Sequence, residues 1–213
     1  MARQLADVLI ATPRRLPAGE RRQQLMDVAL QLFSERGFRA TTMDDIADGA
    51  GVTKPLLYQH FDSKRDLYLE LSESFAQAVL DAIGKATAEA QGPRQQVEEG
   101  FAAYFHLLQD RTSAFRLLFA GDVQKDRELS RARWRVENSL AELVDNLIVD
   151  AGLEPDHRRL LGYAVVGMVD GACRHFLRTR DDSEPIDAAE IDRLGQRLAD
   201  LAWAGLRAVH RDY

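Results

Sequence analysis

The segment from Thr41 to Lys64 constrains the fold more than any other part of this chain. Its pattern predicts two short helices joined by a tight turn at Gly51, followed at once by a third, longer helix. Thr53 stands where the second short helix begins, and Ser63 stands where the longer helix begins, as expected of N-terminal caps. A unit this small is not a catalytic domain, but its second short helix has the right size to enter a DNA major groove.

The rest of the chain also has the periodicity of helices. Apolar residues recur from Leu25 to Phe33 at helical spacing, and no stretch alternates apolar and polar residues as a strand would. We therefore expect an all-α fold of about nine helices, with Gly37 as a left-handed cap after the first. Thr42 and Asp45 predict a capping box for the second. The expected helices lie near residues 17–36, 42–50, 53–61, 64–90, 93–110, 113–120, 127–151, 156–179 and 187–209.

Composition bounds the class of protein. The chain has 213 residues and 46% hydrophobic content, which is enough for a sizeable core. Its sequence has no apolar run near the roughly 18 residues that span a bilayer and no signal-peptide pattern, so we expect a soluble, cytoplasmic protein. Cys173 is the only cysteine, which excludes an internal disulfide framework and a cysteine-based metal site.

Two other classes of protein stay open from the residues alone. A small helical enzyme would need a clustered acid–base or metal set, but the five histidines are scattered without metal-binding spacing. A helical interaction module that does not bind DNA would not require the pattern from Thr53 to Lys64. We therefore expect no enzyme activity, no metal site and no cofactor.

The net charge of −6 is distributed unevenly along the chain. Residues 1–65 hold 10 Lys+Arg and 8 Asp+Glu, a net of +2, whereas residues 66–213 hold 18 and 26, a net of −8. The N-terminal third is mildly basic and can form a local surface that contacts phosphate, although the rest of the chain is acidic. Ordinary scatter of charge would give the same count.

Residues 53–61 combine the features that a groove-reading helix needs. Thr53 and Lys54 lie at its leading end, where free N–H groups and the helix dipole favour phosphate. Leu57 and Phe61, four residues apart, predict a buried side that fixes the helix to its support.

The exposed side of the same helix carries polar residues. Tyr58 lies where its hydroxyl could reach a phosphate, and Gln59 could read a base edge by bidentate contact to adenine. The alternative for Tyr58 is an ordinary half-buried core residue, and the alternative for His60 is a cap on the C-terminus of its helix.

Together these residues resemble the DNA-binding domain of the TetR family of one-component transcriptional regulators. The resemblance covers about residues 20–70 in order, with the spacings of the family. The residues that carry it are Ala29, Leu32, Phe33, Gly37, Phe38, Thr41, Thr42, Ile46, Ala47, Ala50, Gly51, Val52, Leu57, Tyr58, Gln59, His60, Phe61, Ser63 and Lys64. The remaining two-thirds of the chain resembles the family only in length and helical character.

The resemblance implies a set of contacts to the DNA backbone. Thr42 and Thr53 would hydrogen-bond phosphates, and Tyr58 and His60 would contact phosphate or sugar near the end of the recognition helix. Lys64 would pair with a phosphate from the start of the next helix. Without the motif, Lys64 would be an ordinary solvated lysine.

The resemblance also implies which residues face the bases, namely Thr53, Lys54, Pro55 and Gln59. Pro55 stands where many members of the family have glycine, and it offers only apolar contact, for example to a thymine methyl group. Gln59 replaces a tyrosine that is common in the family. The base preference of this protein should therefore differ from that of its relatives.

The chain divides into three expected parts. Residues 1–16 form a flexible basic arm, residues 17–65 the helix-turn-helix DNA-binding domain, and residues 66–213 a ligand-binding and dimerisation domain. Arg14 and Arg15, with Arg21 and Arg22 just after them, could enter a minor groove or follow phosphates. A solvated basic terminus is the alternative.

The helices after residue 66 carry stripes of large apolar and aromatic residues. Helical bundles need such stripes for their cores, which is one interpretation. The family resemblance implies a second, a ligand cavity between the helices. The candidate lining residues are Phe101, Tyr104, Phe105, Leu108, Phe115, Leu118, Phe119, Trp134 and Asp170.

In the family the last two long helices form a four-helix dimer interface, which the resemblance places at residues 157–179 and 187–209. Glycines in the first of these would let another helix approach closely. The candidate interface residues are Gly162, Val166, Gly167, Gly171, Leu194, Leu198 and Leu201. Asp170 lies within the same apolar helix, so we expect it to pair with a partner such as Arg174 or to face the cavity.

These inferences predict a homodimeric transcriptional regulator that binds a pseudo-palindromic double-stranded DNA operator and no membrane. Its two recognition helices would enter successive major grooves, about 34–36 Å apart. A small hydrophobic effector would release the DNA. Repression is the default direction, and activation is the alternative. Residues 115–129 resemble members that sense long-chain acyl-CoA, although planar aromatics, drugs and antibiotics are alternative effectors.

Overall fold

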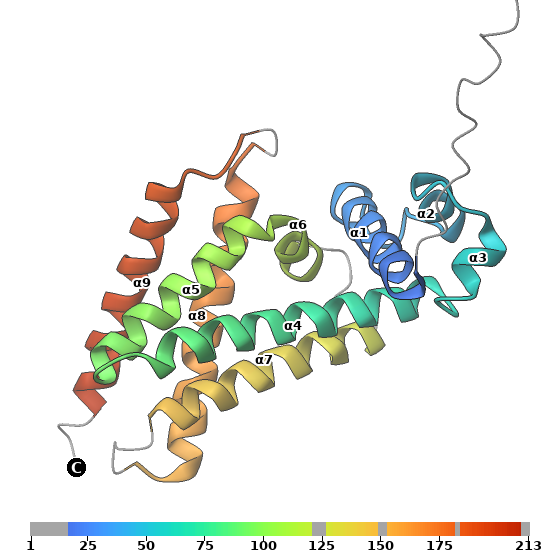
Figure 1. Ribbon diagram of the computed structural model, residues 1–213. Coiled ribbons are helices and arrows are strands. Elements are labelled where there is room, and N and C mark those ends of the chain that lie inside the picture. The colour runs from blue at the N-terminus through green and yellow to red at the C-terminus, as the bar shows by residue number, and fades with distance from the viewer. Residues whose placement is uncertain (1–16, 121–126, 149–152, 182–183, 210–213) are drawn as a thin grey trace, which may run out of the picture.

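The computed structural model describes residues 17–120, 127–148, 153–181 and 184–209. All regular structure in these ranges is helical, which confirms the all-α prediction. In chain order the elements are α1 (Ala18–Arg36), α2 (Met43–Gly49), α3 (Lys54–Tyr58), α4 (Lys64–Ala88), α5 (Pro93–Asp110), α6 (Thr112–Phe115), η1 (Arg116–Ala120), α7 (Arg127–Leu147), α8 (Pro155–Thr179) and α9 (Ala188–Val209) (Figure 1). Within the same ranges, no helix is long and apolar enough to cross a bilayer.

The helix boundaries follow the expected ones to within a few residues. The largest difference is at α7, which ends at Leu147 rather than near residue 151. The segment expected as one helix at 113–120 is instead the short helix α6 followed by the π-helical turn η1. Wider turns of this kind often occur where a helix meets a functional part of a protein.

Local hydrogen bonds fix the starts of α2 and α4. At α2 the backbone N–H of Asp45 donates to Thr42 Oγ1 at 3.1 Å, and the backbone N–H of Thr42 donates to Asp45 Oδ2 at 2.7 Å. This reciprocal pair is the predicted capping box. At α4 the hydroxyl of Ser63 accepts from the backbone N–H of Asp66 at 3.1 Å, so the predicted cap at Ser63 is confirmed as well.

The turn between α2 and α3 depends on Gly51, whose φ of +64° lies in the left-handed region that favours glycine. Thr53 occupies the first position before α3, but among the described contacts its side chain makes no capping hydrogen bond, so that part of the prediction is wrong. The first turn of α3 has one fewer backbone N–H group that needs a partner, because Pro55 has none. The hydroxyl of Thr53 is therefore left at the exposed surface.

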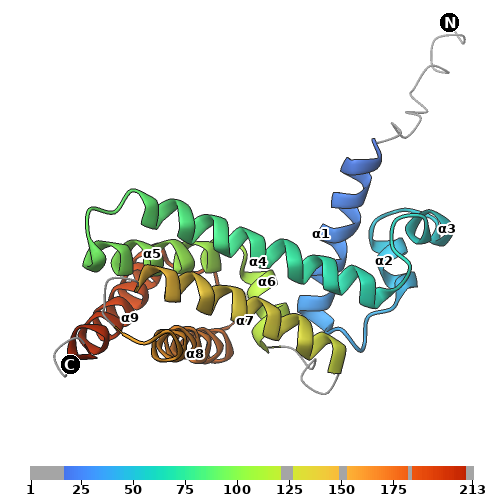
Figure 2. The same cartoon turned by 90° about the horizontal axis from the view of Figure 1, so that it is seen from below.

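The N-terminal helices α1, α2 and α3 lie at one end of α4, and α5 and α7 pack along the rest of it (Figures 1 and 2). In this larger part, α5 packs between α4 and α9, and α7 packs between α4 and α8. At 25 residues, α4 is the element shared by both ends of the molecule.

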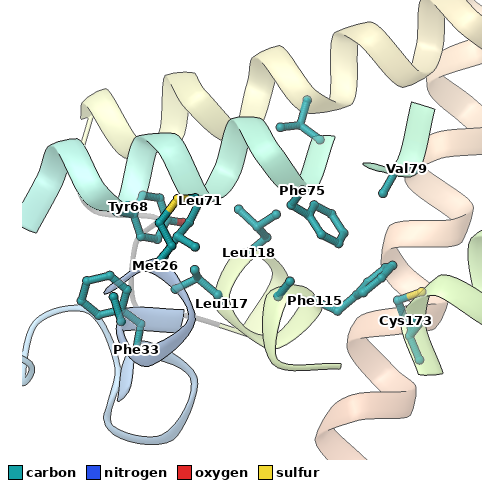
Figure 3. Packing of buried hydrophobic residues seen from close by; sticks show 14 of the residues in the cluster. Met26, Phe33, Tyr68, Leu71, Phe75, Val79, Phe115, Leu117, Leu118 and Cys173 are labelled. Atoms are coloured by element: carbon teal, nitrogen blue, oxygen red, sulfur yellow. The ribbon is translucent and has the colours of Figure 1, made fainter. Parts of the chain in front are cut away.

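The hydrophobic core is continuous from the N-terminal helices into the larger part of the chain. Met26 of α1 lies close to Leu71 of α4, and Leu117 of η1 lies beside them (Figure 3). Further along α4, the ring of Phe75 meets that of Phe115 edge to face, with centroids 4.7 Å apart. Buried side-chain contacts therefore link α4 and η1 to α1.

Candidate nucleic-acid interface and internal cavity

The helix α3 separates its apolar and polar residues cleanly. Leu57 is fully buried, and Phe61, just beyond the helix, is 1% exposed, so both anchor the helix to the N-terminal core. The opposite side is exposed to solvent and carries Thr53, Lys54, Pro55, Tyr58 and Gln59, with Thr42 exposed nearby at the start of α2. Tyr58 is 43% exposed, so part of its side chain is accessible at the surface. These side chains form a polar surface of the size that a DNA groove accepts.

One acidic residue lies within this surface. Lys54 Nζ is 2.7 Å from Asp44 Oδ1, and both side chains are more than half exposed. Hydrogen bonding and charge attraction from Asp44 raise the pKa of Lys54. Asp44 partly neutralises the cation nearest the leading end of α3. The residue types alone did not indicate this pairing, because Asp44 and Lys54 belong to different helices.

Lys64, which is predicted to contact a phosphate, binds the backbone of its own chain in the structure, and its contact with DNA stays a prediction. Its ammonium group donates to the backbone carbonyls of Phe38 and Thr41, each at 2.6 Å, and lies 4.5 Å from the centre of the Phe38 ring. Partial burial lowers its pKa. Lys64 therefore holds the loop between α1 and α2 in place, because that loop presents carbonyls that lack helical partners.

Arg22 also differs from its expected place on a solvated or DNA-bound arm. Its Nε donates to Glu70 Oε1 at 2.8 Å, and its guanidinium lies 4.3 Å from the centre of the Phe61 ring. It also donates to the backbone carbonyl of His60, a half-buried residue directly after α3. Hydrogen bonding to Glu70 raises the pKa of Arg22. Arg22 thus ties α1 to α4 and to the C-terminal end of α3.

Arg21 donates to Gln24 at 2.6 Å within α1. The remaining arm residues Arg14 and Arg15 lie outside the described residues.

A cavity of about 140 Å³ lies in the larger part of the chain, enclosed by α4, α5, α7, α8 and α9. Most of its wall is apolar, with Val97, Leu140, Val144 and Val166 among the lining residues. The cavity extends along α7 from Arg133 to beyond Leu147, a distance of ~21 Å at the rise of an α-helix. It is therefore long and narrow.

The predicted lining residues fall into four groups. Phe101, Tyr104, Leu118 and Asp170 lie in the cavity wall. Three others, Phe105, Leu108 and Phe115, are fully buried in the hydrophobic core and do not line the cavity, and Trp134 is 56% exposed on α7. The side chain of Phe119 lies outside the described residues. Residues that line the cavity and residues that pack in the core lie on the same buried, apolar part of a helix. The spacing of apolar residues alone therefore cannot distinguish the two.

The residues predicted at a dimer interface also differ in their positions. A Cβ atom added to Gly162 would lie 2.5 Å from the carbonyl oxygen of Ala141, so this glycine serves the packing of α8 on α7 within the chain, not a dimer contact. Val166 lines the cavity, and Leu194 and Leu198 pack partly buried against the core of the same chain. Gly167, Gly171 and Leu201 are exposed.

A charged cluster forms one part of the cavity wall. Asp170 Oδ2 accepts hydrogen bonds from Arg133 Nη2 at 2.9 Å and from Arg174, the partner expected from the sequence. Arg133 Nε in turn donates to Glu137 Oε1 at 2.8 Å. Burial raises the pKa of Asp170, while the two guanidinium groups oppose that shift. The sequence contains one indication of this cluster, because Arg133 and Glu137 lie four residues apart on the otherwise apolar side of α7.

Two further polar groups lie close to this cluster. Burial raises the pKa of Tyr104 well above its ordinary value. Burial likewise raises the pKa of Cys173 to about 12, although a hydrogen bond with Tyr104 opposes that shift. Both side chains are therefore neutral at physiological pH.

A short helix-turn-helix unit with an exposed polar recognition helix, attached to a larger helical part with an internal cavity, defines a DNA-binding regulator of the one-component class. Residues 25–71 match the family described as bacterial regulatory proteins, tetR family. The HTH-type transcriptional activator FasR of Mycolicibacterium smegmatis is 32% identical over 196 residues, which cover 92% of this chain and 87% of that protein. The chain belongs to the TetR family of transcriptional regulators.

Two further proteins are similar to this chain, one over part of its sequence and one in its fold. The HTH-type transcriptional repressor KstR2 of Rhodococcus jostii is 41% identical over 78 residues, 37% of this chain and 38% of that protein. The structure of FadR from Bacillus subtilis in complex with stearoyl-CoA matches with a TM-score of 0.72 at 16% identity, covering 86% of this chain and 98% of that one, which shows the same fold. The relatives are transcriptional regulators, which counts against both a small helical enzyme and a module that does not bind DNA.

Proposed function

We propose that this protein is a homodimeric regulator in which residues 17–65 bind operator DNA and residues 66–213 bind a hydrophobic effector and form the dimer. The observation that carries the proposal is the position of α4. Its second turn holds Glu70, which anchors Arg22 beside α3, and its sixth turn places Ile83 in the cavity wall. One continuous helix therefore contacts both the DNA-binding unit and the cavity, so that a change at one can shift the other.

At the DNA, the exposed residues of α3 take the roles that their chemistry allows. Thr53 and Tyr58 bind backbone phosphates with their hydroxyl groups. Thr42 does the same from the start of α2, in exchange for the hydrogen bond that its hydroxyl donates to Asp45. Gln59 reads the edge of a base, and Pro55 contacts an apolar group such as a thymine methyl. The surface is completed by Lys54, which lies beside Asp44, and by the half-buried His60. Residues 1–16 add contacts to the DNA backbone.

A dimer would present two such helices to one operator. The exposed residues Gly167 and Gly171 of α8 and Leu201 of α9 lie on the two helices proposed for the interface, and Leu160 on α8 is 65% exposed. A two-fold interface would bury this apolar surface in both copies at once. The two recognition helices would then lie in successive major grooves, about 34–36 Å apart.

The shape of the cavity favours an effector with a long apolar chain, of which an acyl-CoA is one example. Its volume of about 140 Å³ is close to that of an engineered cavity that binds benzene, yet it extends ~21 Å along α7. A chain-like molecule would have to widen so thin a space by separating the helices around it. An effector that prefers the widened conformation would shift α4 and thereby the DNA-binding unit. FadR, which shares the fold, has been solved with stearoyl-CoA.

The direction of regulation has two candidates. Repression, with the effector releasing the operator, is the direction predicted from the sequence. Activation is favoured by one observation, the similarity over nearly the whole chain to FasR, which is a transcriptional activator. A reporter gene placed behind the operator separates the two, because deletion of the regulator raises expression under repression and lowers it under activation.

A gel-shift titration tests the proposal as a whole. The full-length protein is mixed with the DNA upstream of its own gene at low salt, with and without stearoyl-CoA, and coenzyme A alone is the control. We expect a shifted complex whose midpoint moves with stearoyl-CoA and not with coenzyme A. No complex at low salt would exclude this operator, and a midpoint that ignores stearoyl-CoA would exclude the acyl-CoA effector.

A further inference from the structure

The charged residues in the cavity wall are gathered at one end. Among the described lining residues, those with a formal charge are Arg133, Glu137 and Asp170. Arg133 and Glu137 belong to the first half of α7, on the side of the DNA-binding unit, whereas the lining residues in the second half of α7 are apolar (Figure 2). The cavity is therefore apolar along its length and polar at one end.

The hydrogen bonds within this polar end leave one atom without a partner. Asp170 Oδ2 accepts from both Arg133 and Arg174, but Asp170 Oδ1 is buried and has no hydrogen-bond partner among the described atoms. Asp170 is 8% exposed, so water does not reach it freely. A buried carboxylate oxygen without a donor is unfavourable, and each native example calls for an explanation.

We propose that Asp170 Oδ1 is the polar anchor of the effector site and accepts a hydrogen bond from a hydroxyl group at one end of an elongated apolar ligand. This inference rests on the proposed function, because it concerns the same cavity. The hydroxyl supplies the donor that Oδ1 lacks, and the chain of the ligand lies along the apolar wall formed by α5, α7 and α8. Asp170 is thus a specificity-determining residue for the effector.

The surrounding charges explain why the anchor selects a neutral donor. The guanidinium groups of Arg133 and Arg174 are already hydrogen-bonded to Asp170 Oδ2, and Arg133 also binds Glu137. A ligand carboxylate at this position would meet the negative charge of Asp170. An ether or a hydrocarbon would displace any water and still leave Oδ1 without a hydrogen-bond donor. A site built around a buried hydrogen-bonding group rejects ligands of this kind.

The test compares two ligands that differ only in whether they carry a hydrogen-bond donor. Dodecan-1-ol and 1-methoxyundecane contain the same atoms in unbranched chains, but only the alcohol carries an O–H group. Isothermal titration calorimetry of the full-length protein should give a dissociation constant at least about tenfold lower for the alcohol. Equal constants would overturn the anchor and leave the apolar effector site intact. Failure of both compounds to bind would overturn the anchor together with the proposed effector.

Substitutions locate the effect at Asp170. Asp170→Ala should bring the two dissociation constants together. Asp170→Asn should do the same, because its amide oxygen would turn towards the guanidinium groups of Arg133 and Arg174 and leave at the Oδ1 position an NH2 group, which donates to an alcohol and an ether alike. Val144→Trp, on the apolar half of α7, should weaken both ligands by the same factor. Circular dichroism checks that each variant is folded. If Asp170→Ala does not fold, the comparison of the two ligands on the unmodified protein decides the question. A preference that survives in folded Asp170→Ala would contradict the assignment.

Discussion

Arg22 of α1 and Glu70 of α4, 48 residues apart in sequence, are joined by a hydrogen bond of 2.8 Å from Arg22 Nε to Glu70 Oε1. The same guanidinium donates to the carbonyl of His60 and covers the ring of Phe61. The pair therefore positions the end of α3 relative to α4, the helix that reaches the cavity. Under the proposed function, a signal that moves α4 would act on α3 partly through this contact.

Glu70→Gln should weaken DNA binding by about two- to fivefold, because the exposed ion pair it removes is worth roughly 0.2–1 kcal/mol. Both side chains are about one-third exposed, so we expect only a small change in the free energy of unfolding. Fluorescence anisotropy with labelled operator DNA measures the affinity. Glu73→Gln, at an exposed residue of the same helix, controls for the lost charge, and an equal effect of both variants would contradict the positioning role.

Gly51→Ala should lower the free energy of unfolding by roughly 1–2 kcal/mol, since an alanine side chain is strained at its φ of +64°. It should also weaken DNA binding, because the turn sets the angle between α2 and α3. Gly19→Ala is the matched control in an open position of α1 and should be neutral or slightly stabilising. Urea denaturation of both variants at one protein concentration gives the comparison. A harmless Gly51→Ala would show that the turn does not need the left-handed conformation.

Gly162→Ala should destabilise the chain by roughly 1–3 kcal/mol, because the new Cβ would lie 2.5 Å from the carbonyl oxygen of Ala141 and force α8 away from α7. Gly84→Ala, in the interior of α4 with open space around it, should instead gain roughly 0.5–1 kcal/mol. Thermal unfolding at equal concentrations distinguishes the two. If Gly162→Ala kept full stability and changed only the oligomeric state, the intrachain role of Gly162 would be incorrect.

Asp44→Asn should raise the affinity for operator DNA by about two- to fivefold, because Lys54 would no longer share its charge with a carboxylate 2.7 Å away. Asp81→Asn changes the charge equally at an exposed position of α4 far along the chain and serves as the control. Anisotropy titrations at two salt concentrations measure both. An unchanged affinity in Asp44→Asn would place Lys54 away from the phosphates.

Tyr68 makes the stability of the protein sensitive to alkaline pH. Burial raises its pKa from 10.0 to about 12, so the folded chain holds the phenolic proton more tightly than the unfolded chain. The contribution of Tyr68 is fully present below pH 10 and is lost as the pH rises towards 12. Tyr68→Phe should remove about 1.4 kcal/mol of the loss between pH 9 and pH 11, measured by denaturant titration. If the exposed-site variant Tyr58→Phe reduced the loss of stability as much as Tyr68→Phe, this origin would be contradicted.

The helices and their caps follow from the sequence because their causes are local. Thr42 and Asp45 are three residues apart, and Ser63 lies three residues before the N–H that it accepts from, so neighbouring residues suffice to predict both caps. The exposed face of α3 follows from the same short-range periodicity. Local pattern is thus enough for the helix-turn-helix unit.

The positions of other side chains depend on partners that are distant in the sequence. The ammonium of Lys64 binds carbonyls 23 and 26 residues earlier, and no local pattern distinguishes that arrangement from a solvated lysine. Phe101 and Phe105, one helical turn apart, are both buried, yet only Phe101 reaches the cavity. Which side of a buried helix faces empty space depends on how neighbouring helices fill it, which periodicity does not report.

The salt dependence of DNA binding tests the central claim most directly. The affinity of the full-length protein for the DNA upstream of its gene is measured by anisotropy from low to moderate salt, for the unmodified chain and for Lys54→Ala. The account predicts that the logarithm of the binding constant falls linearly with the logarithm of salt, and that Lys54→Ala reduces the slope by about 0.9. Absence of binding at low salt, or a slope that Lys54→Ala leaves unchanged, would contradict the assignment of α3 as the helix that meets DNA.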